Sequence, residues 1–499
     1  MPVTTNGSHA PAPQVAIIGA GMSGMCMAMR LHREGIETFT IFEKAGEVGG
    51  TWRENRYPGL SCDVPSPFYS YSFAPNADWS TRFSDGAEIQ AYFKGVAQRA
   101  GVLDRVRYDT EIIDAAFDGD RWRLRSAAGE EFTADVVVAA TGVLHQPRIP
   151  DIPGLETFAG AAFHSARWDE SVPLDGRRIA VIGTGSTGVQ IVTALSTRAA
   201  KVTQFQRSAQ WIAPVPNYTY SRAWRGLLHR FPRLNELRYR GTAMQYGLFT
   251  TAVVRPGWQR SLIQAVCRLN LHTIRDRDLR RRMTPDYEPM CRRLIMSSGY
   301  YRAIQRPSVE VVDAGIDHLE PRGIVTADGR LHECDVIALA TGFDAHAFVR
   351  PMTVTGRDGL TLDEAWAPGP RAHRTVTVPG FPNLFLMLGP NSPIGNTSLV
   401  PLAESQADFV ARWVRRIASG EIHDVAPTAE ATAAFNAAIR DNMRDTVWVT
   451  GCDSWYIGPD GQPTMWPFAI DEFHRMMAAT PDDREYEITR APAPAVTVA

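Results

Sequence analysis

Residues 14–43 read QVAIIGAGMSGMCMAMRLHREGIETFTIFE, and residues 178–207 read RIAVIGTGSTGVQIVTALSTRAAKVTQFQR. Each stretch begins with a short apolar run, continues with G-x-G-x-x-G and a helical segment, and ends in a β-rich run. One glycine pattern alone would be a weak indication, but two in this context predict two dinucleotide-binding βαβ units. Their glycines let the backbone approach a pyrophosphate, whose charge is stabilised by the N-terminus of the following helix.

The two units differ 24 residues beyond their first glycine, where the first has Glu43 and the second has Arg207. A carboxylate at this position accepts hydrogen bonds from ribose hydroxyls and repels a 2′-phosphate, whereas an arginine pairs with that phosphate. Ser208 adds a hydroxyl group beside the arginine. The first unit therefore suits the ADP half of FAD, and the second suits NADPH in preference to NADH.

The fold class expected from this pattern is α/β, with two Rossmann-like dinucleotide-binding domains, for FAD and NADP, and a helical insertion. The runs VVVAATG (136–142) and VIALATG (336–342) are typical of buried strands and lie where each domain would close. The expected parts are a disordered leader of residues 1–13, a discontinuous FAD-binding domain of residues 14–145 and 344–499, an NADP-binding domain of residues 146–218 and 291–343, and a helical insertion of residues 219–290.

The insertion is strongly basic. Residues 222–282 contain 14 Arg against three acidic residues, a local charge of about +11. Trp224, Leu227, Leu228 and Phe231 follow helical spacing up to Pro232. Such a surface suits weak contact with a membrane surface or an anionic partner. The alternative is a solvated basic face that packs against the acidic remainder of the chain.

Overall composition excludes several classes of protein. A formal charge of −2 over 499 residues argues against a nucleic-acid-binding protein. The six Cys form no C-x-x-C and no cluster with His, which argues against structural zinc, disulfide exchange and a secreted disulfide framework. No apolar run reaches the roughly 20 residues of a transmembrane segment. The N-terminus lacks the features of a signal peptide, so we expect a cytoplasmic protein without a metal site.

The segment FAGAAFHSARWD, which precedes the second unit, carries a resemblance to a known family. It resembles the fingerprint of the class B flavoprotein monooxygenases, and within them the type I Baeyer–Villiger monooxygenases, and the likeness runs from about residue 14 to residue 475. The fingerprint residues are Phe158, Gly160, His164, Trp168 and Asp169. The resemblance implies that His164 couples domain motion rather than transferring a proton.

Further segments match the family residue by residue. VGGTWRENRYPGLSCDVPS (48–66) resembles the loop that wraps the flavin ring. The cofactor-binding residues implied by the glycine motifs and the resemblance are Gly19, Gly21, Met22, Ser23, Gly24, Glu43, Gly50, Thr51, Trp52, Asp63, Tyr69 and Ile112 for FAD, and Gly183, Thr184, Gly185, Ser186, Thr187, Gly188, Gln190, Arg207, Ser208 and Arg292 for NADP.

Two segments resemble the catalytic parts of the family. MCRRLIMSSGYY (290–301) implies that Arg293 is the active-site arginine, while Arg292 stands where the family has a lysine that holds NADP. GCDSWYIGPDG (451–461) resembles the C-terminal loop over the active site and implies that Trp455 lines the substrate tunnel. The usual continuation G-A-N-I-P-G-K reads G-P-D-G-Q-P-T here. Together with Asp63, which would orient Arg293, these residues make up the expected catalytic set.

The resemblance also implies a reaction. NADPH reduces FAD, the reduced flavin and O2 give a C4a-peroxyflavin, and its attack on a ketone yields an ester or lactone. Arg293 would stabilise the anionic intermediates. The expected partners are a small ketone and O2. One alternative is a flavin monooxygenase that oxidises sulfur or nitrogen, and another is a non-oxygenating FAD/NADPH oxidoreductase. A disulfide oxidoreductase would need a C-x-x-C beside the flavin.

Overall fold

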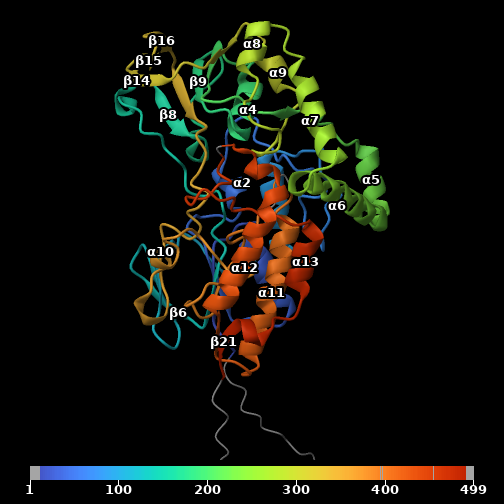
Figure 1. Ribbon diagram of the computed structural model, residues 1–499, viewed down its shortest axis with the longest axis vertical. Coiled ribbons are helices and arrows are strands. Elements are labelled where there is room, and N and C mark those ends of the chain that lie inside the picture. Colours follow the sequence, from blue (N-terminus) through green and yellow to red (C-terminus); the bar gives the residue numbers. More distant parts are fainter. Residues whose placement is uncertain (1–11, 394, 396, 453, 491–499) are drawn as a thin grey trace, which may run out of the picture.

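The computed structural model describes residues 12–393, 395, 397–452 and 454–490. Apart from residues 12 and 13, the leader predicted for residues 1–13 lies outside the described residues. Figure 1 shows an elongated molecule with one parallel sheet in its upper part, helices α11–α13 along its lower part, and helices α5–α7 projecting at one side. Within these described ranges, no helix combines the length and the apolar character that crossing a membrane requires.

The first βαβ unit forms the centre of a five-stranded parallel sheet of order β19-β7-β1-β2-β3. Its strands are β1 (Val15–Ile18), β2 (Phe39–Phe42), β3 (Val106–Arg107), β7 (Val136–Ala139) and β19 (Leu384–Leu386). Strands β1 and β7 are buried at every position, as their unbroken apolar sequences predict for a sheet covered on both faces. Helix α1 (Met22–Arg33) packs against α11 (Val400–Ala418).

The second unit forms a matching five-stranded parallel sheet of order β13-β10-β9-β17-β8. Its strands are β8 (Ala161–His164), β9 (Arg178–Ile182), β10 (Lys201–Phe205), β13 (Val309–Val312) and β17 (Val336–Leu339), and its helix is α4 (Ser186–Leu195). The α/β fold class with two dinucleotide-binding sheets is therefore confirmed. The domain limits expected above stay a prediction.

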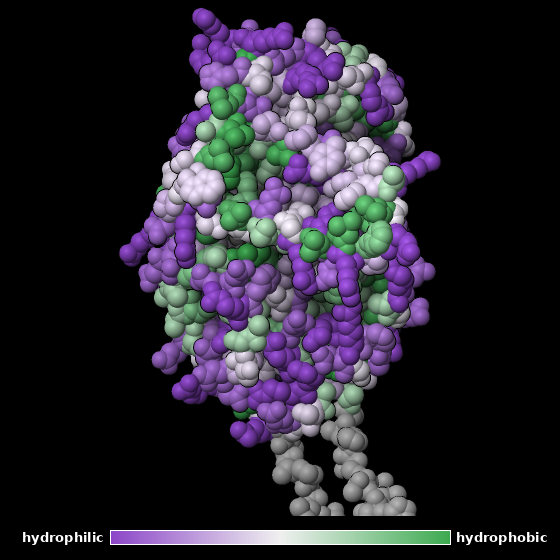
Figure 2. All heavy atoms as spheres, turned by 90° about the vertical axis from the view of Figure 1, so that its right-hand side faces the viewer, coloured by the Kyte–Doolittle hydropathy of each residue, from purple (hydrophilic) through white to green (hydrophobic). Residues whose placement is uncertain are grey.

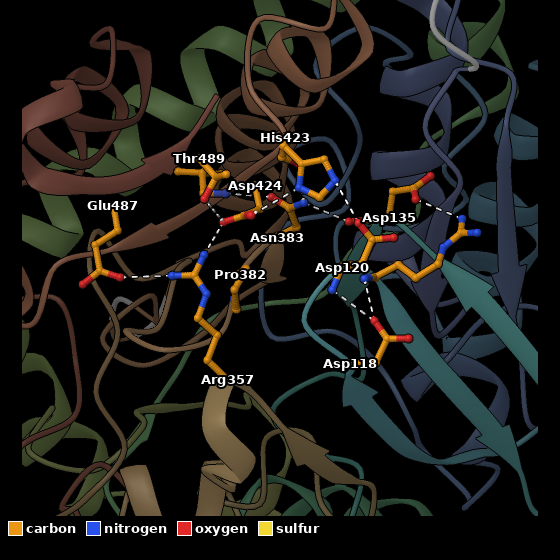
Figure 3. Close-up of polar contacts among 12 residues, drawn as sticks. Asp118, Asp120, Asp135, Arg357, Pro382, Asn383, His423, Asp424, Glu487 and Thr489 are labelled. Atoms are coloured by element: carbon orange, nitrogen blue, oxygen red, sulfur yellow. Dashed lines mark hydrogen bonds and ion pairs between the residues drawn. The ribbon is translucent and has the colours of Figure 1, made fainter. Parts of the chain in front are cut away.

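The first sheet takes strands from both ends of the chain, because β19 pairs with β7. Beside it lies a second sheet of order β18-β4-β5-β6, again with one strand from the later part. Figure 3 shows the polar contacts that hold these parts together. Arg357 forms ion pairs with Asp424 and Glu487. The Asn383 side chain donates to the Asp135 carbonyl oxygen at 2.9 Å, so residues far apart in sequence form one unit.

The predicted helical insertion contains α5 (Arg222–Arg230), α6 (Pro232–Val254), α7 (Trp258–Leu271) and α8 (Arg277–Arg282). Pro232 is the first residue of α6, where its missing N–H costs no hydrogen bond, so the proline separates two helices. The remaining elements are α2 (Thr51–Glu54), α3 (Gly86–Arg99), β4 (Ile112–Phe117), β5 (Trp122–Ser126), β6 (Glu131–Ala134), β11 (Ile212–Ala213), β12 (Ile295–Met296), α9 (Tyr300–Ala303), β14 (Ile316–Glu320), β15 (Gly323–Thr326), β16 (Leu331–Glu333), β18 (Thr353–Thr355), α10 (Leu362–Ala365), β20 (Asp424–Pro427), α12 (Ala429–Asp441), α13 (Ile470–Ala478) and β21 (Tyr486–Thr489), together with short 3-10 turns.

Candidate active site

Both glycine motifs form tight turns between a strand and a helix. A Cβ on Gly24 would lie 1.9 Å from the Gly19 carbonyl oxygen, and one on Gly188 would lie 2.3 Å from that of Gly183. Gly185 differs, because a Cβ there would meet none of the described atoms within 4 Å. The third glycine of each motif thus permits close helix–strand packing. In the first unit a Cβ on Gly21 would lie 3.6 Å from the Gly50 Cα, an ordinary contact, whereas in the second unit Gly185 leaves room in front of the helix N-terminus. That room fits a pyrophosphate.

Glu43 follows β2 and is buried beside the first glycine turn. Its carboxylate accepts hydrogen bonds from the backbone N–H groups of Ala20 (2.8 Å) and Ala45 (3.0 Å). Burial raises the pKa of Glu43, and these two hydrogen bonds act in the opposite direction. Met22 and Ser23 begin α1, while Ile112 begins β4 two residues after Thr110, whose N–H binds the Glu43 carbonyl oxygen. This turn fits the adenosine half of FAD.

In the second unit, Arg207 and Ser208 follow β10. The Arg292 Nη1 donates to Ser208 Oγ at 2.6 Å, and the Arg292 guanidinium lies 4.4 Å from the centre of the Tyr287 ring. Thr184, in the glycine turn, donates to the Ser208 carbonyl oxygen at 2.8 Å. The fold thus brings Arg292, which is remote in sequence, to the edge that Arg207 also occupies. Two arginines beside a hydroxyl fit the 2′-phosphate of NADP.

Arg293 and Asp63 form a two-pronged ion pair. Arg293 Nε donates to Asp63 Oδ2 at 2.6 Å, and Nη2 donates to Oδ1 at 2.7 Å. Their side chains are 28% and 14% exposed. Burial lowers the pKa of Arg293, but the facing carboxylate outweighs it and raises that pKa well above its usual value. Arg293 is therefore a permanent cation with a fixed orientation.

The loop expected to wrap the flavin lies between the two units. Gly50 adopts a φ of +54°, and Thr51 starts the short helix α2. The Trp52 indole donates to the Tyr69 hydroxyl at 3.2 Å, so these two predicted FAD contacts touch each other.

Helix α4 of the second unit is tied to this loop by side-chain hydrogen bonds. Gln190 donates to the Ser61 carbonyl oxygen at 2.9 Å and accepts from the Tyr57 hydroxyl at 2.9 Å. Thr187, one turn earlier, contacts the same hydroxyl at 3.5 Å. Ser61 lies two residues before Asp63. The sequence placed Gln190 among the NADP residues and gave no sign of this bridge, which brings the two cofactor units to one place.

The C-terminal loop is joined to the arginine segment by a disulfide between Cys291 and Cys452, whose Cα atoms lie 6.1 Å apart. The cysteine spacing argued against disulfide exchange and a secreted disulfide framework, and it gave no indication of this single pairing. Its two halves are 161 residues apart, so no local pattern marks them. The bridge connects the residue before Arg292 with the loop that carries Trp455.

Trp455 is partly exposed and packs edge-on against Tyr456, with ring centres 4.4 Å apart. Tyr456 is buried, and its hydroxyl makes no well-formed hydrogen bond within the described part of the chain. Burial raises the pKa of Tyr456 to about 12, although nearby Arg293 acts in the opposite direction. Tyr456 is a site residue that sequence reasoning missed, and its position next to Trp455 was the available signal.

The fingerprint lies at the connection between the units. His164 Nε2 lies 2.9 Å from the Gly342 carbonyl oxygen, and its Nδ1 accepts from the Ala166 N–H. Burial lowers the pKa of His164, in keeping with a neutral ring that donates from Nε2. Phe158 is buried, Trp168 packs on Phe163, Asp169 binds Ser171, and a Cβ on Gly160 would clash with the Asp335 carbonyl oxygen. These contacts fix the course of the chain between the units.

Comparison with known proteins agrees with this geometry. Residues 12–222 match the family model described as flavin-binding monooxygenase-like. The chain is 55% identical to an uncharacterized monooxygenase of Mycobacterium tuberculosis, over 96% of both chains. It is 40% identical to a Baeyer–Villiger monooxygenase of Streptomyces coelicolor, over 97% of this chain and 93% of that protein.

Among solved structures, the cyclohexanone monooxygenase from Rhodococcus sp. Phi1 bound to NADP+ superimposes with a TM-score of 0.86 at 30% identity. The superposition covers 97% of this chain and all of that one. The expected family and cofactors are confirmed. The chain belongs to the Baeyer–Villiger family of FAD- and NADPH-dependent flavoprotein monooxygenases.

Proposed function

We propose that Arg293, held by Asp63, stabilises the negative charge that develops when this enzyme converts a ketone and O2 into an ester or lactone. We assign FAD binding to residues 14–145 and 344–499, and NADPH binding to residues 146–218 and 291–343. The paired sheets, the two glycine turns and the convergence of both units on the loop of residues 57–63 support this division.

When bound, FAD reduced by NADPH supplies the activated oxygen. The carbonyl oxygen of the ketone becomes negative as the new carbon–oxygen bond forms. A cation that is already oriented stabilises this charge without the cost of reorganising solvent. Asp63 occupies Nε and Nη2 of Arg293 and so fixes the plane of the guanidinium. Trp455 and Tyr456 lie on the loop that the disulfide ties to this segment, and we propose that they form one wall of the ketone site.

The observation that carries the proposal is the Arg293–Asp63 pair. Arg293→Ala should keep its FAD and should still be reduced by NADPH, because both glycine turns and the contact of Arg292 with Ser208 are left unchanged. Ester formation should fall about a hundred- to a thousandfold, with the consumed O2 released as hydrogen peroxide. Arg293→Lys should restore little, since an ammonium group cannot reproduce the two parallel hydrogen bonds. Asp63→Ala should show a milder form of the same uncoupling.

Arg292→Ala is the matched control, because it removes the neighbouring arginine, which binds Ser208 instead of Asp63. It should raise the Michaelis constant for NADPH and leave the yield of ester per NADPH unchanged. Stopped-flow absorbance follows flavin reduction, and mass spectrometry measures the ester. Wild-type rates of ester formation in Arg293→Ala would remove this residue from the mechanism.

The same product analysis decides between carbon and heteroatom oxidation. Purified enzyme, NADPH and a mixed panel of ketones and sulfides should give esters or lactones as major products. Sulfoxides as the only products would favour the alternative function at the same site. The cytoplasmic location expected from the sequence stays a prediction.

A further inference from the structure

Helices α6 and α7 of the insertion expose a large number of apolar side chains. On α6 these are Leu237, Met244 and Leu248, and on α7 they are Trp258, Leu262 and Leu269. Each of the six side chains is 55–71% exposed. The spacings of 7 and 4 residues on α6, and of 4 and 7 on α7, place each set on one side of its helix. We call these six residues the apolar face.

This concentration is peculiar to the insertion. Of the sixteen large hydrophobic residues exposed in the described chain, nine lie between Leu227 and Leu269. Figure 2 shows hydrophobic residues gathered in the upper half of the side on which α5–α7 project in Figure 1. Single exposed apolar residues are ordinary, but a group of this size marks an interaction surface.

The surface around the apolar face is basic. The charge of about +11 on residues 222–282 leaves about −13 for the rest of the chain, since the whole carries −2. Arg240, Arg255 and Arg268 each have one carboxylate partner. Arg230 and Arg233 are exposed, and no described carboxylate lies within 4 Å of either. Much of this positive charge is therefore not balanced within the fold.

We propose that α5–α7 dock this enzyme on the surface of an anionic lipid bilayer. The apolar face enters the headgroup region, and the surrounding arginines contact the lipid phosphates. Surfaces that combine exposed apolar side chains with arginines bind anionic bilayers in this way. A second copy of the chain fits less well, because residues 222–271 hold nine Arg against one Glu, and pairing two such faces would bring two charges of about +8 together. The proposal goes beyond the oxygenation reaction and does not depend on the role of Arg293.

The docking helices also contact the chain near the loop that carries Trp455. At its C-terminal end α6 contributes the buried residues Ala252, Val253 and Val254, and a Cβ on Gly395 would contact both Val253 and Trp448. Arg260 of α7 donates to the Asp445 carbonyl oxygen at 2.8 Å. The docked helices thus adjoin the segment that leads into the loop of Cys452 and Trp455. A ketone dissolved in the bilayer would be delivered beside this loop.

The test is co-sedimentation of the full-length, FAD-loaded enzyme with vesicles. Vesicles of phosphatidylglycerol and phosphatidylcholine should bind the enzyme at about 0.1 M salt, and pure phosphatidylcholine vesicles should bind it at least about tenfold more weakly. Arg230→Gln and Arg233→Gln should each weaken binding to the anionic vesicles about fivefold. The triple variant Trp258→Gln, Leu262→Gln, Leu269→Gln should weaken it about tenfold or more.

A matched control is the double variant Ile149→Gln, Leu360→Gln, which removes two exposed apolar side chains outside the insertion. This variant should bind the anionic vesicles as tightly as the wild type does. Equal binding to both kinds of vesicle, or an unaffected triple variant, would overturn the proposal. So would a dimer in analytical ultracentrifugation that the triple variant dissociates, because the apolar face would then belong to a second copy. Activity on a water-soluble ketone tests the oxygenation separately, since the arginine variants and the triple variant lie in the insertion and leave Arg293 and the residues assigned to both cofactors unchanged.

Discussion

The two βαβ units share the order of strand, glycine turn, helix and parallel strand, and they differ at the edge where a nucleotide sugar would lie. In both units the third glycine lies close to the carbonyl oxygen of the first. A Cβ added to Gly24 would lie 1.9 Å from the Gly19 oxygen, and one added to Gly188 would lie 2.3 Å from the Gly183 oxygen. In the first unit this edge carries the buried carboxylate of Glu43, which is hydrogen-bonded to two backbone N–H groups. In the second it carries Arg207 and Ser208, with Arg292 added from a distant segment. We therefore expect the shared glycines to bind a dinucleotide and the neighbouring charges to select which one.

The largest expected effect comes from filling the glycine turns. Gly24→Ala should abolish FAD binding, because its Cβ would overlap the Gly19 carbonyl oxygen. Gly188→Ala should leave the protein yellow and raise the Michaelis constant for NADPH at least about a hundredfold. Gly226→Ala, where no described atom lies within 4 Å of the new Cβ, is the control. FAD per chain and NADPH kinetics are the measurements. Loss of FAD from Gly188→Ala would show that the two units do not bind independently.

A second difference lies in what covers each helix. Helix α1 packs on α11, which carries Glu404, whereas α4 packs on the short α9. Burial raises the pKa of Glu404 to about 7, although hydrogen bonds from Ser72 oppose it. The folded protein then retains a proton that the unfolded chain releases above about pH 4.3. The contribution to stability is therefore complete below that pH and is lost as the pH rises through about 7.

Glu404→Gln should remove this pH dependence. Between about pH 4.5 and pH 8, the free energy of unfolding of the variant should fall by on the order of 3 kcal/mol less than that of the wild type. Urea denaturation of both proteins across this range measures the difference. If the free energy of unfolding of the two proteins varied with pH in parallel, the burial of Glu404 would not raise its pKa, and the prediction would be wrong.

The smallest expected effect concerns Arg207, which distinguishes the edge of the second unit from that of the first. Arg207→Ala should raise the Michaelis constant for NADPH about ten- to a hundredfold, which corresponds to a charge-assisted contact of about 1.5 to 3 kcal/mol. Use of NADH should change little, because NADH has no 2′-phosphate. Ser208→Ala should show the same selectivity to a lesser degree. Steady-state kinetics with both cofactors is the measurement, and an equal loss with both would assign Arg207 a structural role.

Much of the fold could be predicted because its patterns are local. The glycine spacing and the apolar runs at 15–18 and 179–182 predicted both βαβ units, and Pro232 predicted the end of one helix and separates it from the next. The site depended on resemblance. A lone arginine in a chain with 49 Arg carries no sign of its role, and Arg293 was singled out by its likeness to a family segment. The structure shows the contact with Asp63 that the same resemblance implied, while the catalytic role of Arg293 stays a proposal.

The sequence by itself determined the two nucleotide-binding units and the charges at their edges, because strand, turn and helix are set by residues within about thirty positions of one another. Only the tertiary structure decided what lies between them. Arg293 meets Asp63 across 230 positions, Cys291 meets Cys452 across 161, and Tyr57 meets Gln190 across 133. Contacts at such separations leave no periodicity in the chain, since they arise when whole sheets pack together. Resemblance to the family implied the first of these contacts, and the other two appear only in the folded protein.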